Sequence, residues 1–332
     1  DFISQGFNDH RVYSNYGNIL KDLGKLEEAE KLFIKAIKFK PNFAIAYYNL
    51  GNTLKDLNRL KEAELSLRKA IHFQPGFGNA YYNLATVLND LGQLEEAEIL
   101  YKKVIKRNPD FADAHISLGN ILKKLGKVEE GVLETEKGIN LSFLQNIDSK
   151  KRGDCEKYMS FSKSQFRQDL FVLSELNFKK NGFFVEFGSY DGLLGSNSYL
   201  LEKIFNWDGI LAEPAISCHN KLKKNRSVSI EKRCVWKSSN KEILFNEPCT
   251  YKQLATIDSF TDKEEKIYKE GTKYKVKTIS LLDLLDLNHA PEFIDYLSID
   301  TEGSEYDILN AFDFQKYKFR VITCEHNFTP IR

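Results

Sequence analysis

The sequence predicts two domains of different fold class: an α-helical solenoid, followed by an α/β domain built on a parallel sheet. The first half of the chain repeats itself, because Pro41, Pro75 and Pro109 lie 34 residues apart. In the second half, short apolar runs alternate with helical patterns, which is typical of parallel strands joined by helices. A length of 332 residues is sufficient for two such domains.

Composition and charge are those of an ordinary globular protein. Apolar residues make up 42% of the chain, and 48 basic residues balance 47 acidic ones. A net charge of +1 gives no general attraction for nucleic acid or for an anionic membrane. No apolar stretch approaches the roughly 20 residues of a membrane-spanning helix. The five cysteines show no paired spacing, which favours free thiols in a cytoplasmic protein over disulfides or structural zinc.

Four consecutive frames, over residues 10–145, share one pattern of two helices. In the second frame, each helix presents an apolar stripe at helical spacing: Tyr47, Leu50 and Leu54 in the first, and Ala63, Leu67 and Ala70 in the second. Small Gly51 and Ala63 are expected to let the two helices approach closely, and Pro75 to end the second helix. The fourth frame carries Gly131 and Gly138 where the others have mostly alanine.

This pattern resembles the tetratricopeptide repeat. The resemblance implies helix pairs that stack into a superhelix with a concave face. We expect the repeats to occupy residues 1–145, and the polar stretch 146–162 to be a linker.

Asparagines recur at corresponding places of the first helices: Asn15, Asn49 and Asn83, and three residues later Asn18, Asn52 and Asn120. An amide on the concave face can pair with an extended backbone, since it both donates and accepts hydrogen bonds. A similar ladder occurs in the peptide-binding repeats of O-linked N-acetylglucosamine transferases. The sequence therefore predicts a protein or peptide partner in the repeat groove. The alternative is that these amides are solvated or form hydrogen bonds between repeats.

Five apolar runs in residues 163–332 are candidate strands of the α/β domain: residues 183–187, 209–213, 228–235, 296–300 and 320–325. The stretches "SNSYLLEKIF" and "EYDILNAF" between them have the apolar spacing of helices. Residues 240–280 are mixed in pattern. Within them, residues 274–280 predict an additional strand, and "LLDLLDL" predicts a short helix after Ser280.

The loop after the first strand reads "EFGSYDG" over residues 186–192. Ligands of open α/β sheets bind outside the carboxyl ends of the strands. Gly188 allows a tight turn there, and Gly192 opens the approach to the next helix. The spacing E-x-G-x-x-x-G differs from that of dinucleotide sites and suits S-adenosylmethionine. Glu213 ends the second strand, where a carboxylate can accept hydrogen bonds from both ribose hydroxyls.

Several stretches together resemble the FkbM-type methyltransferase family: "SQFRQDLFVL", "GFFVEFGSYDGLLGSNSYLLEK", "WDGILAEP", "TISLLDLL", "YLSIDTEGSEYDILNAFDF" and "VITCEHN". The resemblance covers residues 164–329. It implies a Rossmann-like class I fold and methylation of a hydroxyl group, often on a sugar or a secondary metabolite. The family's fold continues beyond "EHNFTPIR", so its last strands are expected to be absent from this chain.

The resemblance also implies which residues bind S-adenosylmethionine: Glu186, Gly188, Ser189, Asp191, Gly192, Asn197 and Glu213. Gln165, Gln168 and Asp169 would close over the cofactor from the N-terminal side. Tyr190 stands where the family usually has a glycine, and we expect it to narrow the pocket.

Four carboxylates lie at or shortly after the end of the strand at 296–300: Asp300, Glu302, Glu305 and Asp307. Asp300 ends this strand, where the methyl group should lie, and His326 follows the neighbouring strand; we expect one of them to be the catalytic base. Ser304 and Asp307 are spaced as a capping box, and Glu305 falls in the first turn of the next helix. Alternatively, hard oxygen ligands from Asp300, Glu302, Glu325 and Asn327 would hold Mg²⁺, although we do not favour a metal.

Two hypotheses of different class follow. The first is an S-adenosylmethionine-dependent O-methyltransferase that acts on a sugar or glycan hydroxyl and uses its repeats to recruit a partner or substrate. The second is a repeat-mediated interaction protein whose methyltransferase-like domain is inactive or only binds the cofactor. A glycosyltransferase lacks a sugar-nucleotide motif, and the glycine spacing disfavours a nicotinamide oxidoreductase.

Overall fold

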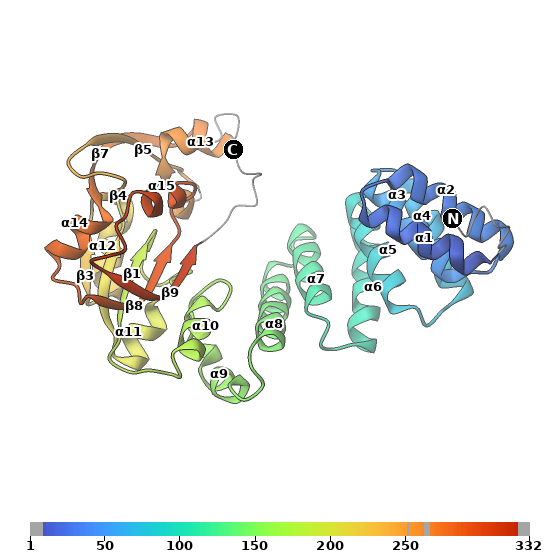
Figure 1. Ribbon diagram of the computed structural model, residues 1–332, viewed down its shortest axis with the longest axis horizontal. Coiled ribbons are helices and arrows are strands. Elements are labelled where there is room, and N and C mark those ends of the chain that lie inside the picture. Colours follow the sequence, from blue (N-terminus) through green and yellow to red (C-terminus); the bar gives the residue numbers. More distant parts are fainter. Residues whose placement is uncertain (1–8, 251, 262–265, 325–332) are drawn as a thin grey trace. The chain divides into compact units, whose positions relative to one another are not determined.

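The computed structural model describes residues 9–250, 252–261 and 266–324, and the chain divides into two compact units after Gln145. The first unit is an array of antiparallel helix pairs (Figure 1). Its helices are α1 (His10–Asp22), α2 (Leu26–Phe39), α3 (Ala44–Asp56), α4 (Leu60–Phe73), α5 (Gly78–Asp90), α6 (Leu94–Arg107), α7 (Ala112–Lys124) and α8 (Val128–Asn146). The helical solenoid predicted from the 34-residue period is confirmed.

Small residues in the first helix of a pair accommodate large residues of the second. A Cβ atom added to Gly51 would lie 2.7 Å from Cγ of Leu67, which is fully buried. Such a distance is shorter than van der Waals contact, so only glycine allows α3 and α4 to approach this closely. Gly17 has the same relation to Phe33. The prediction of close helix approach at Gly51 is therefore confirmed.

In the last helix pair, α7 and α8 are in contact through their backbones. A Cβ atom on Gly131 would lie 2.7 Å from the carbonyl oxygen of Gly119, and one on Gly138 would lie 2.7 Å from that of Ala112. Glycine thus replaces the alanine usual at these two positions because α7 and α8 leave no room for a methyl group.

The second unit begins in the segment that we expected to be a linker. This segment is largely helical, with α9 (Arg152–Tyr158) and a 3-10 turn, Met159–Phe161. The ring of Tyr158 packs edge-on against Phe205 at 4.8 Å, and Lys151 donates a hydrogen bond to the carbonyl of Ser174. Polar composition suggested a linker, but Tyr158 anchors the helix to the α/β unit, and the buried Cys155 packs inside it.

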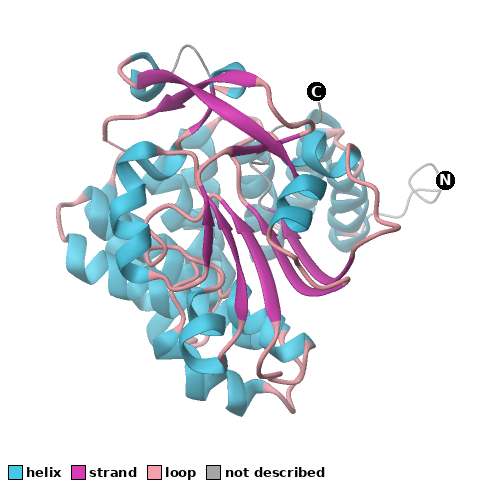
Figure 2. Cartoon of the chain, turned by 90° about the vertical axis from the view of Figure 1, so that its left-hand side faces the viewer, coloured by secondary structure: helices cyan, strands magenta, loops and turns pink. Residues whose placement is uncertain are grey.

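A five-stranded parallel sheet, in the order β3-β2-β1-β8-β9, forms the centre of the second unit (Figure 2). Its strands are β1 (Phe183–Phe187), β2 (Asp208–Ala212), β3 (Ser229–Glu231), β8 (Phe293–Ile299) and β9 (Lys318–Cys324). Strand order reverses between β1 and β8, which is where open α/β sheets bind ligands. The predicted parallel α/β class is confirmed.

The stretch 228–235, predicted as one strand, forms two strands in different sheets. After β3, the carboxylate of Glu231 accepts hydrogen bonds from the backbone N–H groups of Lys232 and Arg233 and turns the chain. The chain then enters a second sheet, of order β4-β7-β5-β6. Its strands are β4 (Cys234–Trp236), β5 (Glu242–Glu247), β6 (Thr256–Ile257) and β7 (Thr272–Ser280).

Helices pack on the faces of the parallel sheet. The remaining helices are α10 (Gln168–Glu175), α11 (Tyr199–Phe205), α12 (His219–Asn225), α13 (Lys266–Lys269), α14 (Leu281–Leu287) and α15 (Glu305–Asn310). Helices α14 and α15 join Val185 and Phe187 of β1 in one apolar core. The predicted helix after Ser280 is confirmed, and the hydroxyl of Ser280 caps it by accepting from the N–H of Asp283. None of the helices in the described ranges has the length and apolarity needed to cross a membrane.

The predicted capping box at Ser304 and Asp307 is wrong. Ser304 makes no side-chain cap bond, and its hydroxyl instead donates to Thr301 at 2.7 Å. Glu305 satisfies the backbone of this loop instead, because its carboxylate accepts hydrogen bonds from the N–H groups of Thr301 and Gly303. The loop between β8 and α15 is therefore closed by a carboxylate from the first helical turn.

We predict that Gly131→Ala destabilises the repeat unit by roughly 1–3 kcal/mol, the usual cost of overpacking. The new methyl group would meet the backbone of Gly119, and the resulting strain outweighs the helix propensity of alanine, which by itself favours the substitution by about 1 kcal/mol. Urea unfolding of the full chain, followed by circular dichroism, measures the change.

Gly78→Ala is the matched control. Gly78 begins α5, nothing lies within 4 Å of the added Cβ, and the equivalent residues Ala44 and Ala112 are alanines. This variant should be as stable as the wild type or slightly more so. Equal stability of the Gly131 and Gly78 variants would contradict the close contact between α7 and α8.

Candidate functional site

Three predicted site residues meet at the carboxyl-terminal rim of the parallel sheet. Gly188 follows β1, Glu213 follows β2 and Asp300 follows β8, and all three line one cavity. Adjacent parallel strands end at the same edge, so their terminal residues converge although they are far apart in the sequence. The rim is therefore where we place the candidate active site.

Position 188 requires a glycine, both for its backbone conformation and for the close approach of a neighbouring residue. Its φ angle is +72°, in the left-handed region that favours glycine. A Cβ atom there would clash with the carbonyl oxygen of Asp300. The loop after β1 can therefore pass directly beside the end of β8 only because residue 188 has no side chain.

Glu213 ties the first two strand ends together. Its two carboxylate oxygens accept hydrogen bonds from the backbone N–H groups of Tyr190, at 2.7 Å, and Ala215, at 2.8 Å. The side chain is 5% exposed, and burial raises its pKa to about 7. The two backbone donors lower that pKa, and the neighbouring charges of Glu247 and Glu186 raise it.

Tyr190 occupies the position where a glycine was expected from the family pattern. Its φ angle of +46° lies in the left-handed region, so the tyrosine backbone is strained by about 1 kcal/mol. The half-buried ring packs against an apolar cluster that includes Cys218 and Phe245. Packing of this ring holds the strained loop in place, but Tyr190 is not among the residues that line the cavity.

Two further loop residues have separate local roles. Asp191 accepts hydrogen bonds from the N–H groups of Leu193 and Leu194 and so closes its own turn. Gly192 has a φ angle of +75°, and a Cβ atom there would lie 2.6 Å from the side chain of Leu222 in α12. The structure thus places both residues beside the rim but not on the cavity.

Ser189 differs from its neighbours because its buried hydroxyl has no protein partner. The residue is 1% exposed, directly follows Gly188, and is one of three described residues with such an unpartnered side-chain atom. A buried hydroxyl without a hydrogen bond is unfavourable by about 1–3 kcal/mol. Ser189 is not among the residues that line the cavity.

Glu186 and Asn197 lie beneath the rim. Glu186 accepts hydrogen bonds from the N–H of Asn197, at 2.8 Å, and from the hydroxyls of Ser196 and Ser198. The guanidinium of Arg226 lies 3.7 Å from it. Asn197 donates to Ser298 in β8 at 3.0 Å. Neither residue lines the cavity, and their visible role is to hold residues 196–198 against the sheet.

The segment at 162–169 packs against the same loop. Ser164 pairs with Gly195 in a β-bridge and donates to Asn197 at 2.7 Å. Gln168 accepts from the N–H of Phe166, and Gln165 is exposed. Asp169 is fully buried, which raises its pKa to about 6. These side chains are absent from the cavity lining.

Of the two predicted catalytic residues, Asp300 and His326, the structure describes only Asp300. Asp300 lines the cavity together with Thr301 and Ser304. His326 lies outside the described residues, and so do Glu325 and Asn327 of the alternative Mg²⁺ set. Within the ranges that the structure describes, no group of three or more His, Cys, Asp or Glu residues is arranged to hold a metal ion.

No sequence motif predicted the other wall of the cavity. This wall comes from the second sheet and its turns, through Lys252, Phe245, Ala255 and Ile257. Behind it, Glu247 accepts a hydrogen bond from the hydroxyl of Tyr274 at 2.7 Å. Its carboxylate also lies 3.9 Å from Lys252. These residues come from the region of mixed pattern, where no motif predicted a function.

The rim cavity is small. Its volume is about 30 Å³, which leaves room for only one or two water molecules. Typical sites for cofactors and small ligands enclose about 300–1,000 Å³. A ligand of nucleoside size is therefore larger than the cavity as it stands in this structure.

The repeat unit has a separate hollow of about 360 Å³ between α5, α6 and α7. Tyr82, Asn89, Asn120 and Lys124 contribute to its lining. Asn120 is one of the six asparagines noted in the sequence, and it is exposed.

Some of the other asparagines connect successive repeats. Asn83 donates to Asn52 at 2.7 Å and to the hydroxyl of Tyr48 at 3.1 Å. Asn49 donates to Ser14 at 3.5 Å. These contacts are the inter-repeat hydrogen bonds that we considered as the alternative to a peptide ladder.

Comparison with protein families agrees with both halves of the chain. Residues 186–332 match the family described as methyltransferase FkbM domain. Tetratricopeptide-repeat families match residues 17–58, 44–76, 78–111 and 100–132. No curated protein matches the chain.

Solved structures of helical proteins are similar to parts of the chain. A crystal structure of MamA is 24% identical and covers 43% of this chain and 84% of its own, with a TM-score of 0.42. MamA from Desulfovibrio magneticus RS-1 is 25% identical, with coverages of 42% and 79% and a TM-score of 0.40. YrrB, described as a TPR protein with an unusual peptide-binding site, is 22% identical, with coverages of 53% and 79% and a TM-score of 0.40. From the family matches, the chain carries tetratricopeptide repeats over residues 17–132, followed by an FkbM methyltransferase domain over residues 186–332.

Proposed function

We propose that the protein is an S-adenosylmethionine-dependent O-methyltransferase that acts on a sugar or glycan hydroxyl. The observation that supports this most directly is the convergence of Gly188, Glu213 and Asp300 on one cavity at the switch point of the sheet. The family match supports methyl transfer, and the acceptor class follows from the resemblance noted in the sequence.

The residues at the rim carry hydrogen-bonding groups that suit the cofactor. Glu213 keeps lone pairs that can accept hydrogen bonds from two ribose hydroxyls, in addition to its two backbone donors. The unpartnered hydroxyl of Ser189 is a second polar group directly after the Gly188 turn. When bound, S-adenosylmethionine supplies an activated methyl group. The seven residues predicted for its site remain a proposal, and Gly188 and Glu213 are the two that line the cavity.

Binding requires the cavity to open. Its present volume of about 30 Å³ cannot hold a nucleoside. We expect the turn Lys252–Leu254, which lies between β5 and β6, to be the part that shifts away from Glu213 and Asp300. The return of this wall over the bound ligands would exclude water and hold the reacting groups close together. Such positioning supplies much of the acceleration in a displacement reaction.

Asp300 is our candidate for the group that accepts the proton of the acceptor hydroxyl. It lines the cavity from the end of β8, next to the cofactor residues that follow β1 and β2. His326 remains a second candidate. A Mg²⁺ ion held by Asp300 is the alternative, which the experiments below also test.

The repeats have the role of recruiting a protein or peptide. The hollow lined by Tyr82, Asn120 and Lys124 supports this role, since it combines an aromatic wall with amide and cationic groups. The rival hypothesis is an interaction protein whose second domain only binds the cofactor, and it predicts cofactor binding without methyl transfer.

We predict that Glu213→Gln weakens the binding of S-adenosylhomocysteine by at least about tenfold, because an amide has one acceptor oxygen where the carboxylate has two for the ribose hydroxyls. Calorimetry on the full chain measures the affinity. Glu231→Gln is the matched control, since this acid ends the neighbouring strand β3 and pairs with Arg233 outside the cavity. An unchanged affinity in the Glu213 variant would contradict the assignment.

The pH dependence of stability provides a second test of Glu213. Because its pKa is about 7 in the folded protein and 4.5 for an ordinary glutamate, the folded state holds the proton more tightly. The stabilising contribution of the protonated group is present below pH 4.5 and is lost as the pH rises through 7. We expect Glu213→Gln to remove this decrease in urea unfolding experiments between these pH values, and an identical decrease in the variant would contradict the buried carboxyl.

We predict that Asp300→Asn lowers the rate of methyl transfer by about 100-fold or more, as expected for loss of a general base, while the affinity for S-adenosylhomocysteine changes less than threefold. Transfer of labelled methyl groups to sugars and glycans of a cell extract measures the rate. Asp307→Asn is the matched control, because Asp307 lies in α15 and faces Lys237 at 3.8 Å.

The two hypotheses for Asp300 differ in their response to EDTA. A rate that EDTA leaves unchanged supports the base, whereas a loss of activity that Mg²⁺ restores supports the metal. If the wild type binds S-adenosylhomocysteine but transfers no methyl group to any acceptor, the interaction-protein hypothesis is favoured instead.

A further inference from the structure

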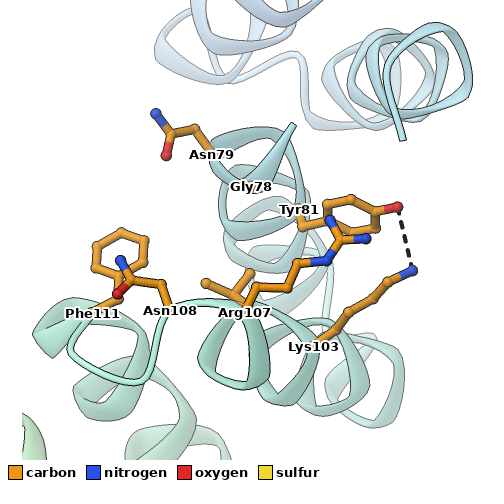
Figure 3. Close-up of a pocket in the computed structure, with 8 residues that line it drawn as sticks. Gly78, Asn79, Tyr81, Lys103, Arg107, Asn108 and Phe111 are labelled. Carbon is orange, nitrogen blue, oxygen red and sulfur yellow. Dashed lines mark hydrogen bonds between the residues drawn. The ribbon is translucent and has the colours of Figure 1, made fainter. Parts of the chain in front are cut away.

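A second cavity lies in the repeat unit, between α5 and α6, and has a volume of about 250 Å³. Figure 3 shows the side chains that line it, with Arg107 lying across the ring of Tyr81 and Lys103 reaching its hydroxyl. We call this cavity the Tyr81 notch; its lining is Gly78, Asn79, Tyr81, Lys103, Val104, Arg107, Asn108 and Phe111. It is distinct from the hollow around Asn120.

The notch is a modified copy of an arrangement present in each of the first three repeats. A lysine ammonium lies over the ring of a tyrosine in every case: Lys35 over Tyr13 at 4.5 Å, Lys69 over Tyr47 at 5.5 Å, and Lys103 over Tyr81 at 4.4 Å. One cation over an aromatic face is therefore a constant feature of these repeats.

The third repeat differs at the residue that covers the tyrosine. Phe39 stacks on Tyr13 at 5.2 Å, and Phe73 stacks on Tyr47 at 5.5 Å. At the corresponding place, the guanidinium of Arg107 lies 4.9 Å from the ring centre of Tyr81. The third repeat thus exchanges an apolar ring for a second cation.

The charge of the notch is unbalanced. None of its eight lining residues is acidic, and neither Lys103 nor Arg107 has a carboxylate partner within 4.0 Å among the described residues. Lys103 donates to the hydroxyl of Tyr81 at 3.3 Å, and Arg107 donates to the carbonyl of Pro75 at 3.1 Å. Both cations keep further N–H donors, since lysine has three and arginine five.

The start of helix α5 adds to the positive potential. Gly78 and Asn79 are its first two residues, and the N-cap residue Phe77 provides no side-chain hydrogen bond to their N–H groups. The positive end of the helix dipole therefore faces the same lining as the two cations. The side-chain amides of Asn79 and Asn108 are additional donors at the edge of the notch.

We propose that the Tyr81 notch binds a phosphate monoester. A phosphate monoester carries a charge close to −2 at neutral pH and presents three acceptor oxygens, which matches two cations with spare donors. A single carboxylate would neutralise only one of them. The volume of the notch accommodates a phosphate with a few further atoms, and Phe111 provides an apolar wall for the group that carries it. The site is independent of the proposed methyl transfer.

Calorimetry on the full chain tests the proposal with four probes: inorganic phosphate, glucose 6-phosphate, a short phosphoserine peptide and its unphosphorylated form. We expect saturable binding of the phosphorylated probes, which weakens as the salt concentration rises, and no binding of the unphosphorylated peptide. Tighter binding of the peptide identifies a phosphorylated protein as the source, and tighter binding of glucose 6-phosphate identifies a small metabolite. Both results support the site.

The repeats themselves provide the variants. Arg107→Phe restores the residue of the first two repeats and should fold, because Phe39 and Phe73 pack in this way on their tyrosines. We expect it, and separately Lys103→Gln, to weaken binding of the phosphorylated probes by at least about tenfold. Lys69→Gln changes the equivalent lysine of the second repeat and should alter the affinity by less than twofold.

Three results would overturn the proposal. The first is an absence of saturable binding of any phosphorylated probe by the wild type. The second is an affinity of Arg107→Phe equal to that of the wild type, or an equal loss in Lys69→Gln and Lys103→Gln. The third is binding of succinate as tight as that of inorganic phosphate, which would show that the notch recognises anions without preference for phosphate.

Discussion

The rim of the parallel sheet depends on one charged hydrogen bond, from the backbone N–H of Tyr190 to the carboxylate of Glu213. This bond fixes the loop after β1 to the end of β2, while Gly188 brings the same loop against the backbone of Asp300. One hydrogen bond from the backbone to a side chain and one close backbone approach thereby hold the three strand ends together. The arrangement requires a buried carboxylate with a raised pKa and a tyrosine backbone in a strained conformation. Strain and burial of this kind are frequent at functional sites.

The fold could be predicted from the sequence where the pattern is regular. The helix pairs follow from a period of 34 residues, and β1 follows from the apolar run "FFVEF", which is buried on both faces of the sheet. The prediction failed where one side chain redirects the chain. Glu231 turns the backbone between β3 and β4, and Tyr158 anchors a polar helix that its composition suggested was a linker. Such tertiary contacts leave no local periodicity.

The candidate site could be predicted only in part for a related reason. The strand-end residues Gly188, Glu213 and Asp300 were identifiable because topology brings them together. Glu186 is likewise an acid near the end of a strand, yet its carboxylate is enclosed by Asn197 and two serines beneath the rim. The opposite wall, from Phe245 to Ile257, comes from a second sheet whose shortest strand has two residues. No sequence pattern of that length distinguishes a strand from a turn.

The wall opposite the strand ends is separate from them in the sequence. All of its cavity-lining residues come from one continuous stretch of chain between β3 and β8, whereas Gly188, Glu213 and Asp300 each directly follow a strand of the parallel sheet. Exchange of that stretch would replace one wall of the cavity and leave the hydrogen bond between Tyr190 and Glu213 intact. Under the proposed function, the range of acceptors would then change through one stretch of chain while the groups that bind the cofactor stay the same.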